Sequence, residues 1–238
     1  MKKAIIVGAS SGIGRSLAKL MVENGYQVGI TGRRANLLNE LKAENPDSYV
    51  TQSFDITDIA TISAQLQALT HTLGSLDILI LSSGTGDLNE SLDFDIEQRT
   101  INTNVSGFTA VADWAFNFFR EQGHGHLVAI SSIAGLRGNY LAPSYSATKA
   151  YQINYLEGLR IKAAKSSQSL IITDIRPGFV NTEMAKGENL FWVAPVDKAA
   201  SQILKAIQQK RKTAYITKRW GILARIMILL PNWVIDRM

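Results

Sequence analysis

Short apolar runs rich in β-branched residues alternate with longer amphipathic stretches along this chain, and that alternation most constrains its fold. Strands that lie between two layers of helices are apolar throughout, as in doubly wound parallel sheets. The apolar runs predict seven strands: Ala4–Val7, Gln27–Thr31, Tyr49–Ser53, Leu76–Leu81, His126–Ser131, Leu170–Ile175 and Ala214–Ile216. The amphipathic stretches predict helices at Ile13–Asn24, Arg34–Glu44, Ile59–Leu73, Ile96–Arg120, Tyr145–Ala164 and Val196–Lys210. We expect an α/β fold with a doubly wound, seven-stranded parallel sheet and helices on both faces.

Length and composition limit the domain organisation. A chain of 238 residues that is 46% hydrophobic can bury one sizeable core, and we expect one domain over residues 1–217 with an apolar C-terminal segment at 218–238. The absence of cysteine excludes disulfides, thiolate metal sites and cysteine nucleophiles. The first apolar run stops at Gly8, too early for a signal peptide, so we expect a cytoplasmic protein. The net charge of +5 favours an anionic cofactor over nucleic acid, because no Lys/Arg-rich run is present.

A glycine-rich turn joins the first predicted strand to the first predicted helix. Its spacing is G-x-x-x-G-x-G, and its candidate cofactor-binding residues are Gly8, Ser10, Ser11, Gly12, Ile13 and Gly14. Glycines allow the close approach that a diphosphate requires, and the free N–H groups of the helix start favour the pyrophosphate. A tight strand-to-helix turn without a ligand is the alternative. The position directly after the first strand favours nucleotide binding.

The end of the second predicted strand indicates which nucleotide. NAD sites usually place a carboxylate there for the ribose 2′-hydroxyl, whereas this chain has Thr31-Gly32-Arg33-Arg34. A guanidinium binds a 2′-phosphate bidentately, so NADP is the predicted cofactor, with Arg33 as the stronger candidate and Arg34 as the second. The alternative is that both arginines merely begin a solvated helix.

A catalytic pair is predicted at the start of the fifth helix. Tyr145 and Lys149 are four residues apart, so both side chains lie on one helical face, and Ser131-Ser132 ends the strand before them. A tyrosine titrates near pH 10, and a neighbouring ammonium together with an oxidised nicotinamide favours its phenolate. The same spacing is common on ordinary helices, so the pair is informative only together with the glycine turn.

These motifs resemble the short-chain dehydrogenase/reductase family in its short single-domain form, with a Rossmann-like sheet, and the resemblance extends to about Thr217. It implies that Ser132 binds the substrate oxygen and that Tyr145 is the general acid in reduction. Lys149 would hold the nicotinamide ribose and lower the tyrosine pKa, and Asn104 would support a water in the proton relay. It also implies a homodimer or homotetramer joined through the long helices that begin near Asn104 and Tyr145.

Further cofactor contacts follow from the same resemblance. The implied residues are Asp55 and Ile56 at the adenine, and Pro177, Gly178, Val180 and Thr182 at the nicotinamide. Two departures stand out: Val7 replaces a usual threonine, and Leu81-Ser82-Ser83-Gly84 replaces the usual Asn-Asn-Ala-Gly. Ser82 and Ser83 would therefore brace the cofactor less rigidly than asparagines, while Gly84 is retained.

The substrate is expected to be an apolar or amphipathic carbonyl compound or alcohol. The candidate substrate residues, besides Ser132 and Tyr145, are Tyr140, Leu141, Met184, Phe191 and Trp192, three of them in a lid segment at Glu183–Pro195. Apolar residues in such a loop can instead dock on the core. Ketoacyl thioesters, steroids, sugars and xenobiotic ketones all fit the same catalytic geometry.

The C-terminal segment is more apolar than an exposed terminus should be. Arg225 and Pro231 interrupt it, so it cannot span a bilayer. One helical face would carry Trp220, Leu223, Met227, Leu230 and Val234. This pattern fits packing over the substrate cleft or against a partner subunit, and also a weak contact with a membrane surface.

Two other functions compete with the enzymatic one. A nucleotide sensor would keep the cofactor site with little turnover, and a membrane-surface protein would act through the C-terminal segment. No metal site is expected from His71, His124 and His126, the last two of which are expected in a solvated turn.

Overall fold

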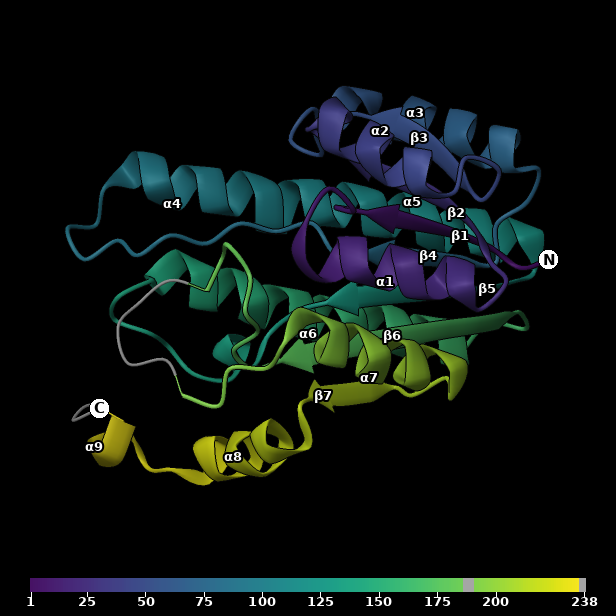
Figure 1. Cartoon of the computed structure of the whole chain (residues 1–238). Helices are drawn as coiled ribbons and strands as arrows, with labels where there is room; N and C mark the ends of the chain where they lie inside the picture. The colour runs from purple at the N-terminus through teal and green to yellow at the C-terminus, as the bar shows by residue number, and fades with distance from the viewer. Residues whose placement is uncertain (186–190, 236–238) are drawn as a thin grey trace.

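One seven-stranded parallel sheet forms the centre of the molecule. The structure, a computed structural model, describes residues 1–185 and 191–235. Its strands are β1 (Lys3–Val7), β2 (Gln27–Gly32), β3 (Tyr49–Ser53), β4 (Ile78–Leu81), β5 (His124–Ile130), β6 (Ser169–Pro177) and β7 (Thr213–Ile216). They are arranged in the order β3-β2-β1-β4-β5-β6-β7, with every neighbouring pair parallel (Figure 1). The predicted doubly wound sheet is confirmed.

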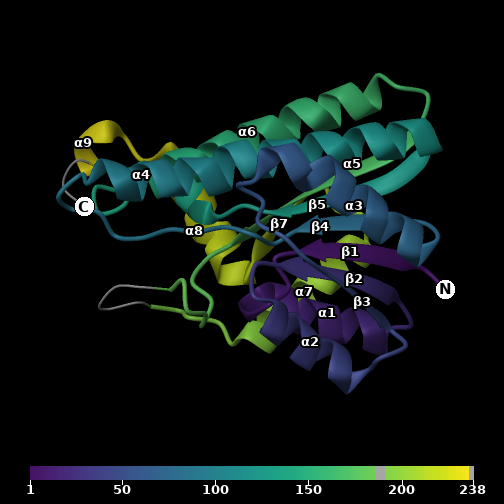
Figure 2. The same cartoon turned by 90° about the horizontal axis from the view of Figure 1, so that it is seen from above.

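Helices cover both faces of this sheet (Figure 2). One layer consists of α1 (Gly12–Glu23), α2 (Ala35–Glu44) and α7 (Val196–Gln208), and the other of α3 (Ile59–Leu73), α5 (Phe108–Gln122) and α6 (Pro143–Ala164). Successive β1 side chains point to opposite faces of the sheet. Ala4 and Ile6 pack with the first helical layer, and Ile5 and Val7 pack with the second. Burial on both faces explains why the strands are apolar throughout.

The stretch predicted as one helix at Ile96–Arg120 is divided into three parts. They are α4 (Phe94–Ile101), a π-helical turn (Asn102–Gly107) and α5. Within that turn Asn104 bonds the backbone of Thr85, accepting from its N–H at 2.9 Å and donating to its carbonyl at 2.7 Å. Gly107 lies so close to Ile56 that a Cβ would be 2.5 Å from the Ile56 carbonyl oxygen. Apolar periodicity did not reveal this turn, because it depends on these two tertiary contacts.

His126 was expected in solvent, and that expectation is wrong. β5 begins at His124, so His126 lies inside a central strand and its side chain is 5% exposed. Its Nε2 is 2.8 Å from the hydroxyl of Thr173 on β6, and burial lowers its pKa to about 4. His126 is therefore a neutral core residue at physiological pH.

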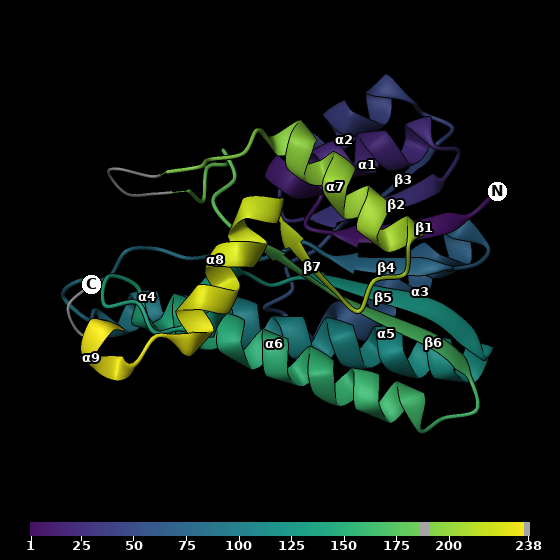
Figure 3. The ribbon, with the colours of Figure 1, turned by 90° about the horizontal axis from the view of Figure 1, so that it is seen from below.

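The C-terminal segment forms two helices, α8 (Lys218–Leu229) and α9 (Asn232–Ile235). Helix α8 follows β7, as Figure 3 shows from below. It lies against a short 3-10 helix, η2 (Ile133–Leu136). Trp220 and Ala224 of α8 are buried in a small cluster with Ile133. Within residues 1–185 and 191–235, no helix has the length and apolar character needed to cross a membrane.

Candidate active site

A cavity of about 1900 Å³ lies at the carboxyl ends of the strands. Segments that follow β1 to β6 line it, together with the first two turns of α6 and one side of α8. Pockets for one small ligand usually measure about 300–1,000 Å³. The cavity therefore has room for a dinucleotide and a second ligand, at the sheet edge where ligands bind in open α/β folds.

The glycine turn forms the floor of this cavity. Gly8 and Gly12 have positive φ angles of 94° and 55°, which other residues rarely adopt. A Cβ at Gly8 would be 2.5 Å from the Ser83 amide nitrogen, and one at Gly14 would be 2.0 Å from the Gly8 carbonyl oxygen. Gly14 therefore packs beneath the turn, while the other five predicted residues of this turn line the cavity.

Two buried hydroxyls support a nucleotide at this site. Thr31 Oγ1 and Ser83 Oγ have no hydrogen-bond partner within the described part of the chain, and both residues line the cavity. Buried polar atoms without partners are uncommon in proteins. The first turn of α1 carries no acidic residue, so its N–H groups and dipole stay available to an anion. The residues present therefore fit a dinucleotide.

The two arginines after β2 have different surroundings. Arg34 donates hydrogen bonds to Ser11 Oγ at 2.6 Å and Ser10 Oγ at 3.1 Å, and forms an ion pair with Glu183. Arg33 is 72% exposed, and its guanidinium is 3.7 Å from the Asp55 carboxylate. Both arginines line the cavity, as do Asp55 and the predicted residues Ile56, Ser82, Ser83 and Gly84. Arg34 is thus already held against the glycine turn, which the sequence alone did not indicate.

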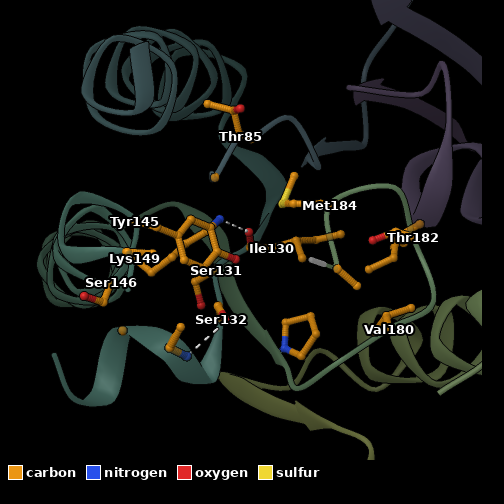
Figure 4. A pocket seen from close by; sticks show the side chains of 18 of the residues that line it. Thr85, Ile130, Ser131, Ser132, Tyr145, Ser146, Lys149, Val180, Thr182 and Met184 are labelled. Atoms are coloured by element: carbon orange, nitrogen blue, oxygen red, sulfur yellow. Dashed lines mark hydrogen bonds between the residues drawn. The ribbon is translucent and has the colours of Figure 1, made fainter. Parts of the chain in front are cut away.

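Ser132, Tyr145 and Lys149 meet on one side of the cavity (Figure 4). Ser132 caps η2, where its Oγ accepts from the Ala134 N–H at 3.1 Å. Tyr145 lies in the first turn of α6, and the Lys149 ammonium is 5.8 Å from the centre of its ring. Gly86 packs on that ring so closely that a Cβ there would be 2.4 Å from it. The predicted pair therefore shares a site with the predicted serine.

Burial changes the acidity of both members of this pair. It raises the pKa of the Tyr145 hydroxyl above its ordinary value, and the hydrogen bond with Ser132 opposes this rise. Lys149 is expected to lower the tyrosine pKa, whereas the pKa shift in this structure has two other causes, burial and the opposing hydrogen bond with Ser132. The pKa of Lys149, which is 4% exposed, is lowered by burial to about 8, and Asp174 limits the decrease. Tyr145 is therefore protonated at neutral pH.

Asn104 lies behind the cavity wall and does not line it, because the side-chain amide is engaged by Thr85 and Thr148. A residue that the sequence analysis missed connects it to the lysine. Gln152 Oε1 accepts from Lys149 Nζ at 3.0 Å, and Gln152 Nε2 donates to the Asn104 carbonyl at 2.9 Å. Its position three residues after Lys149, on the same helical face, was the available signal.

The opposite wall follows β6. Pro177, Gly178, Val180 and Thr182 line the cavity there, and Figure 4 shows Val180 and Thr182 across from Tyr145. The backbone of this segment is fixed by hydrogen bonds from Asn181 N to Ala194 O at 2.9 Å and from Thr182 N to Val180 O at 2.7 Å. All four predicted nicotinamide contacts thus line the cavity that contains the predicted catalytic residues, and Val180 and Thr182 face Tyr145 across it (Figure 4).

The predicted substrate residues are only partly brought together. Tyr140, Met184 and Phe191 line the cavity, whereas Leu141 and Trp192 are not among its lining residues. The Leu141 backbone bonds Asn89 and Asn139, and the Trp192 ring packs outside the cavity against Phe191, Trp220 and Arg219. Residues 186–190 of the predicted lid segment lie outside the described residues. Arg137 and α8 supply lining residues that were not predicted as substrate contacts.

Comparisons with known proteins identify the family and support the fold. Residues 2–191 match a family model described as short chain dehydrogenase. A protein of Myxococcus xanthus, described as an uncharacterized oxidoreductase, is 33% identical over 244 residues, which cover 99% of this chain and 95% of that protein. A closed form of serine dehydrogenase complexed with NADP+ has a TM-score of 0.82 at 24% identity, covering 90% of this chain and 94% of its own. The structure of ElxO with NADP bound has a TM-score of 0.78 at 22% identity, with 90% and 96% covered.

Proposed function

Because this chain belongs to the short-chain dehydrogenase family and is one of its oxidoreductases, we propose that it interconverts a carbonyl compound and an alcohol with NADP(H). The observation that carries the proposal is the meeting of Ser132, Tyr145 and Lys149 in a cavity that also contains the glycine turn. The family uses a nicotinamide dinucleotide, the two arginines after β2 favour NADP(H) over NAD(H), and cells usually keep NADPH in its reduced form. Reduction of the carbonyl is then the physiological direction.

The proposed chemistry divides the work among three side chains. Bound NADPH would supply the hydride. Ser132 holds the carbonyl oxygen by a hydrogen bond, and Tyr145 donates its proton to that oxygen as negative charge develops there. The Lys149 ammonium binds the nicotinamide ribose, and its positive charge stabilises the phenolate that Tyr145 leaves. Burial that keeps the Tyr145 hydroxyl protonated at neutral pH suits this role as an acid.

The preference for NADP rests on Arg33 and Arg34. Residues 27–34 contain no carboxylate, and the side chains of Arg33 and Arg34 line the cavity directly after β2, which supports a site for the 2′-phosphate there. Two structurally similar proteins, serine dehydrogenase and ElxO, were observed with NADP. Arg34 is the better placed of the two, because Ser10 and Ser11 already hold its side chain.

The cofactor preference leads to a binding prediction. Arg34→Ala is expected to weaken NADPH binding by roughly tenfold to a hundredfold, the value of one hydrogen-bonded charge pair, and to leave NADH binding nearly unchanged. Arg33→Ala should act in the same direction with a smaller effect. Fluorescence titration of both nucleotides measures this, with Arg160→Ala on the remote surface of α6 as the control. Tighter binding of NADH than NADPH by the unmodified protein would contradict the assignment.

The proposed substrate is an apolar or amphipathic carbonyl compound. Tyr140, Met184 and Phe191 line the same cavity as the catalytic residues, and each has a mostly carbon side chain. A panel of ketones and aldehydes tests this class, and faster turnover of small polar ketones than of apolar ones would contradict it. Assembly into a homodimer or homotetramer through α5 and α6 stays a prediction.

A further inference from the structure

Helix α8 forms an apolar wall of the cavity. Leu223 and Met227 of α8, and Leu230 directly after it, line the cavity. Ile222 and Ile226 of α8 do not line the cavity and are 66% and 49% exposed. Leu223 packs in one cluster with Ile133 and Leu136 of η2, which begins directly after Ser132. An apolar surface therefore extends from the predicted oxygen-binding serine toward the C-terminus of the chain.

Both ends of α8 are fixed. At its start, the Trp220 indole lies on Gly178, where a Cβ would be 2.2 Å from the ring. At its end, the Arg137 guanidinium donates to the carbonyls of Met227 at 2.9 Å and of Ile228 and Leu230 at 2.8 Å each. Carbonyls at a helix C-terminus lack partners within the helix, and an arginine can satisfy several of them. Arg137 follows η2 directly and therefore ties α8 to the segment that carries Ser132.

We propose that η2 and α8 enclose a subsite for an apolar arm attached to the reacting carbonyl, and that Arg137 holds the wall of this subsite in place. The inference rests on the proposed function and narrows its substrate class to carbonyl compounds with an extended hydrocarbon chain or ring system. Each methylene that enters the subsite is removed from water, which favours binding. The Leu223 and Met227 side chains provide the contact surface.

A homologous series of methyl ketones with increasing chain length tests this subsite. For the unmodified enzyme, kcat/KM should rise by up to about fourfold per added methylene, the value of burying one such group. Met227→Gln should flatten that rise, and Arg137→Met should do so by releasing α8, while turnover of the shortest ketone persists. Ile226→Gln is the matched control, because it makes the same kind of change on the exposed side of α8.

Binding without turnover gives a second readout. A long-chain alcohol should raise the melting temperature of the unmodified protein and of Ile226→Gln, and should not raise that of Met227→Gln. A flat chain-length series in an active enzyme, or equal slopes in Met227→Gln and Ile226→Gln, would overturn the subsite. Absence of turnover with every carbonyl tested would instead contradict the proposed function.

A separate observation concerns Gln152, which is 1% exposed and connects two predicted catalytic residues. Its side chain joins Lys149 Nζ to the Asn104 carbonyl by two hydrogen bonds, and Lys149 Nζ also donates to the Ile130 carbonyl at 3.2 Å. Two of the three ammonium hydrogens thus point at acceptors within the described structure, which leaves one for a ligand. The Gln152 amide is covalently held on α6, so it links Lys149 to Asn104 more rigidly than the water expected from the family resemblance would.

The geometry points to Gln152 as a positioning residue that aims the Lys149 ammonium into the cavity and couples it to the π-helical turn. Among the described residues, the charged groups near this ammonium are Asp174 on β6 and its ion-pair partner Arg176, and the neutral but titratable Tyr145 lies beside it on α6. A leucine at position 152 fills a similar volume without bonding, while a glutamate keeps the acceptor and adds a negative charge. The two substitutions therefore have opposite effects on the ammonium.

The pH dependence of carbonyl reduction distinguishes the two variants. Gln152→Leu should lower kcat by roughly tenfold to a hundredfold, the loss of one hydrogen bond to a charged group, with KM little changed. The pH above which the rate falls should decrease in Gln152→Leu and increase in Gln152→Glu, since the added carboxylate favours the ammonium. If Gln152 had only a structural role, its variants would be less stable but would keep the pH profile of the unmodified enzyme. Melting temperatures and NADPH affinities of the variants are therefore measured together with their rates. Identical pH profiles in active variants would overturn the inference, whereas an inactive unmodified enzyme would contradict the proposed function.

Discussion

Tyr145→Phe is expected to lower kcat for carbonyl reduction on the order of a thousandfold, the usual contribution of a positioned general acid. The substitution removes one oxygen atom and leaves the ring on Gly86, so the cavity keeps its shape. NADPH affinity should stay close to that of the unmodified protein, because the glycine turn and the arginines are untouched. Steady-state kinetics and nucleotide titration on the same preparations measure the two quantities.

Tyr151→Phe provides the matched control for this substitution. Tyr151 lies on the same helix, and its hydroxyl contacts the Thr109 hydroxyl at 2.8 Å, away from the cavity lining. We expect its kcat to remain near that of the unmodified enzyme. Equal rates for Tyr145→Phe and Tyr151→Phe would show that the Tyr145 hydroxyl takes no part in proton transfer.

Lys149→Met is expected to lower kcat/KM at least about a hundredfold, because it removes the buried charge that we propose binds the cofactor and stabilises the phenolate. In the unmodified enzyme, reduction should slow as the pH rises above about 8, where the ammonium loses its proton. Lys162→Met, at the far end of α6, is the control and should keep full activity. Rates measured across this pH range in all three proteins test the role of the charge.

The same residue gives a prediction for stability. Burial lowers the pKa of Lys149 from 10.5 to about 8, so between these pH values the unfolded chain binds more protons than the folded one. The free energy of unfolding of the unmodified protein, relative to Lys149→Met, should therefore increase with pH through this window. The difference between 10.5 and about 8 corresponds to roughly 3 kcal/mol. Urea denaturation at both ends of the window measures it, and a relative stability that falls with pH would contradict the burial of a charged lysine.

Local patterns were sufficient to predict the sheet and most of the candidate site. The positive φ angles of Gly8 and Gly12 explain why the turn requires glycine. The carboxyl ends of parallel strands lie at one edge of the sheet, so the order of the motifs predicted that Ser132, Tyr145 and Thr182 line one cavity. The spacing of apolar residues in the strands and helices likewise follows from whether one face or both faces of the element are buried. These features depend on residues close together in the chain.

Features that depend on distant contacts were missed. The π-helical turn requires Thr85 to bond Asn104, and the bridging role of Gln152 requires the same turn beside α6. The position of α8 depends on Arg137, 90 residues before the carbonyl of Met227 that it bonds. Periodicity predicted an apolar helical face in the C-terminal segment, but it could not identify the surface against which that face packs.

Transfer of deuterium tests the central claim most directly. NADPH that carries deuterium at the transferred position is incubated with an apolar ketone and the enzyme, and the alcohol is analysed by mass spectrometry. We predict deuterium on the carbinol carbon of the product with the unmodified enzyme, and little labelled product in the same time with Tyr145→Phe. Tight binding of NADPH without labelled alcohol from any carbonyl, or equal labelling by both proteins, would contradict the assignment.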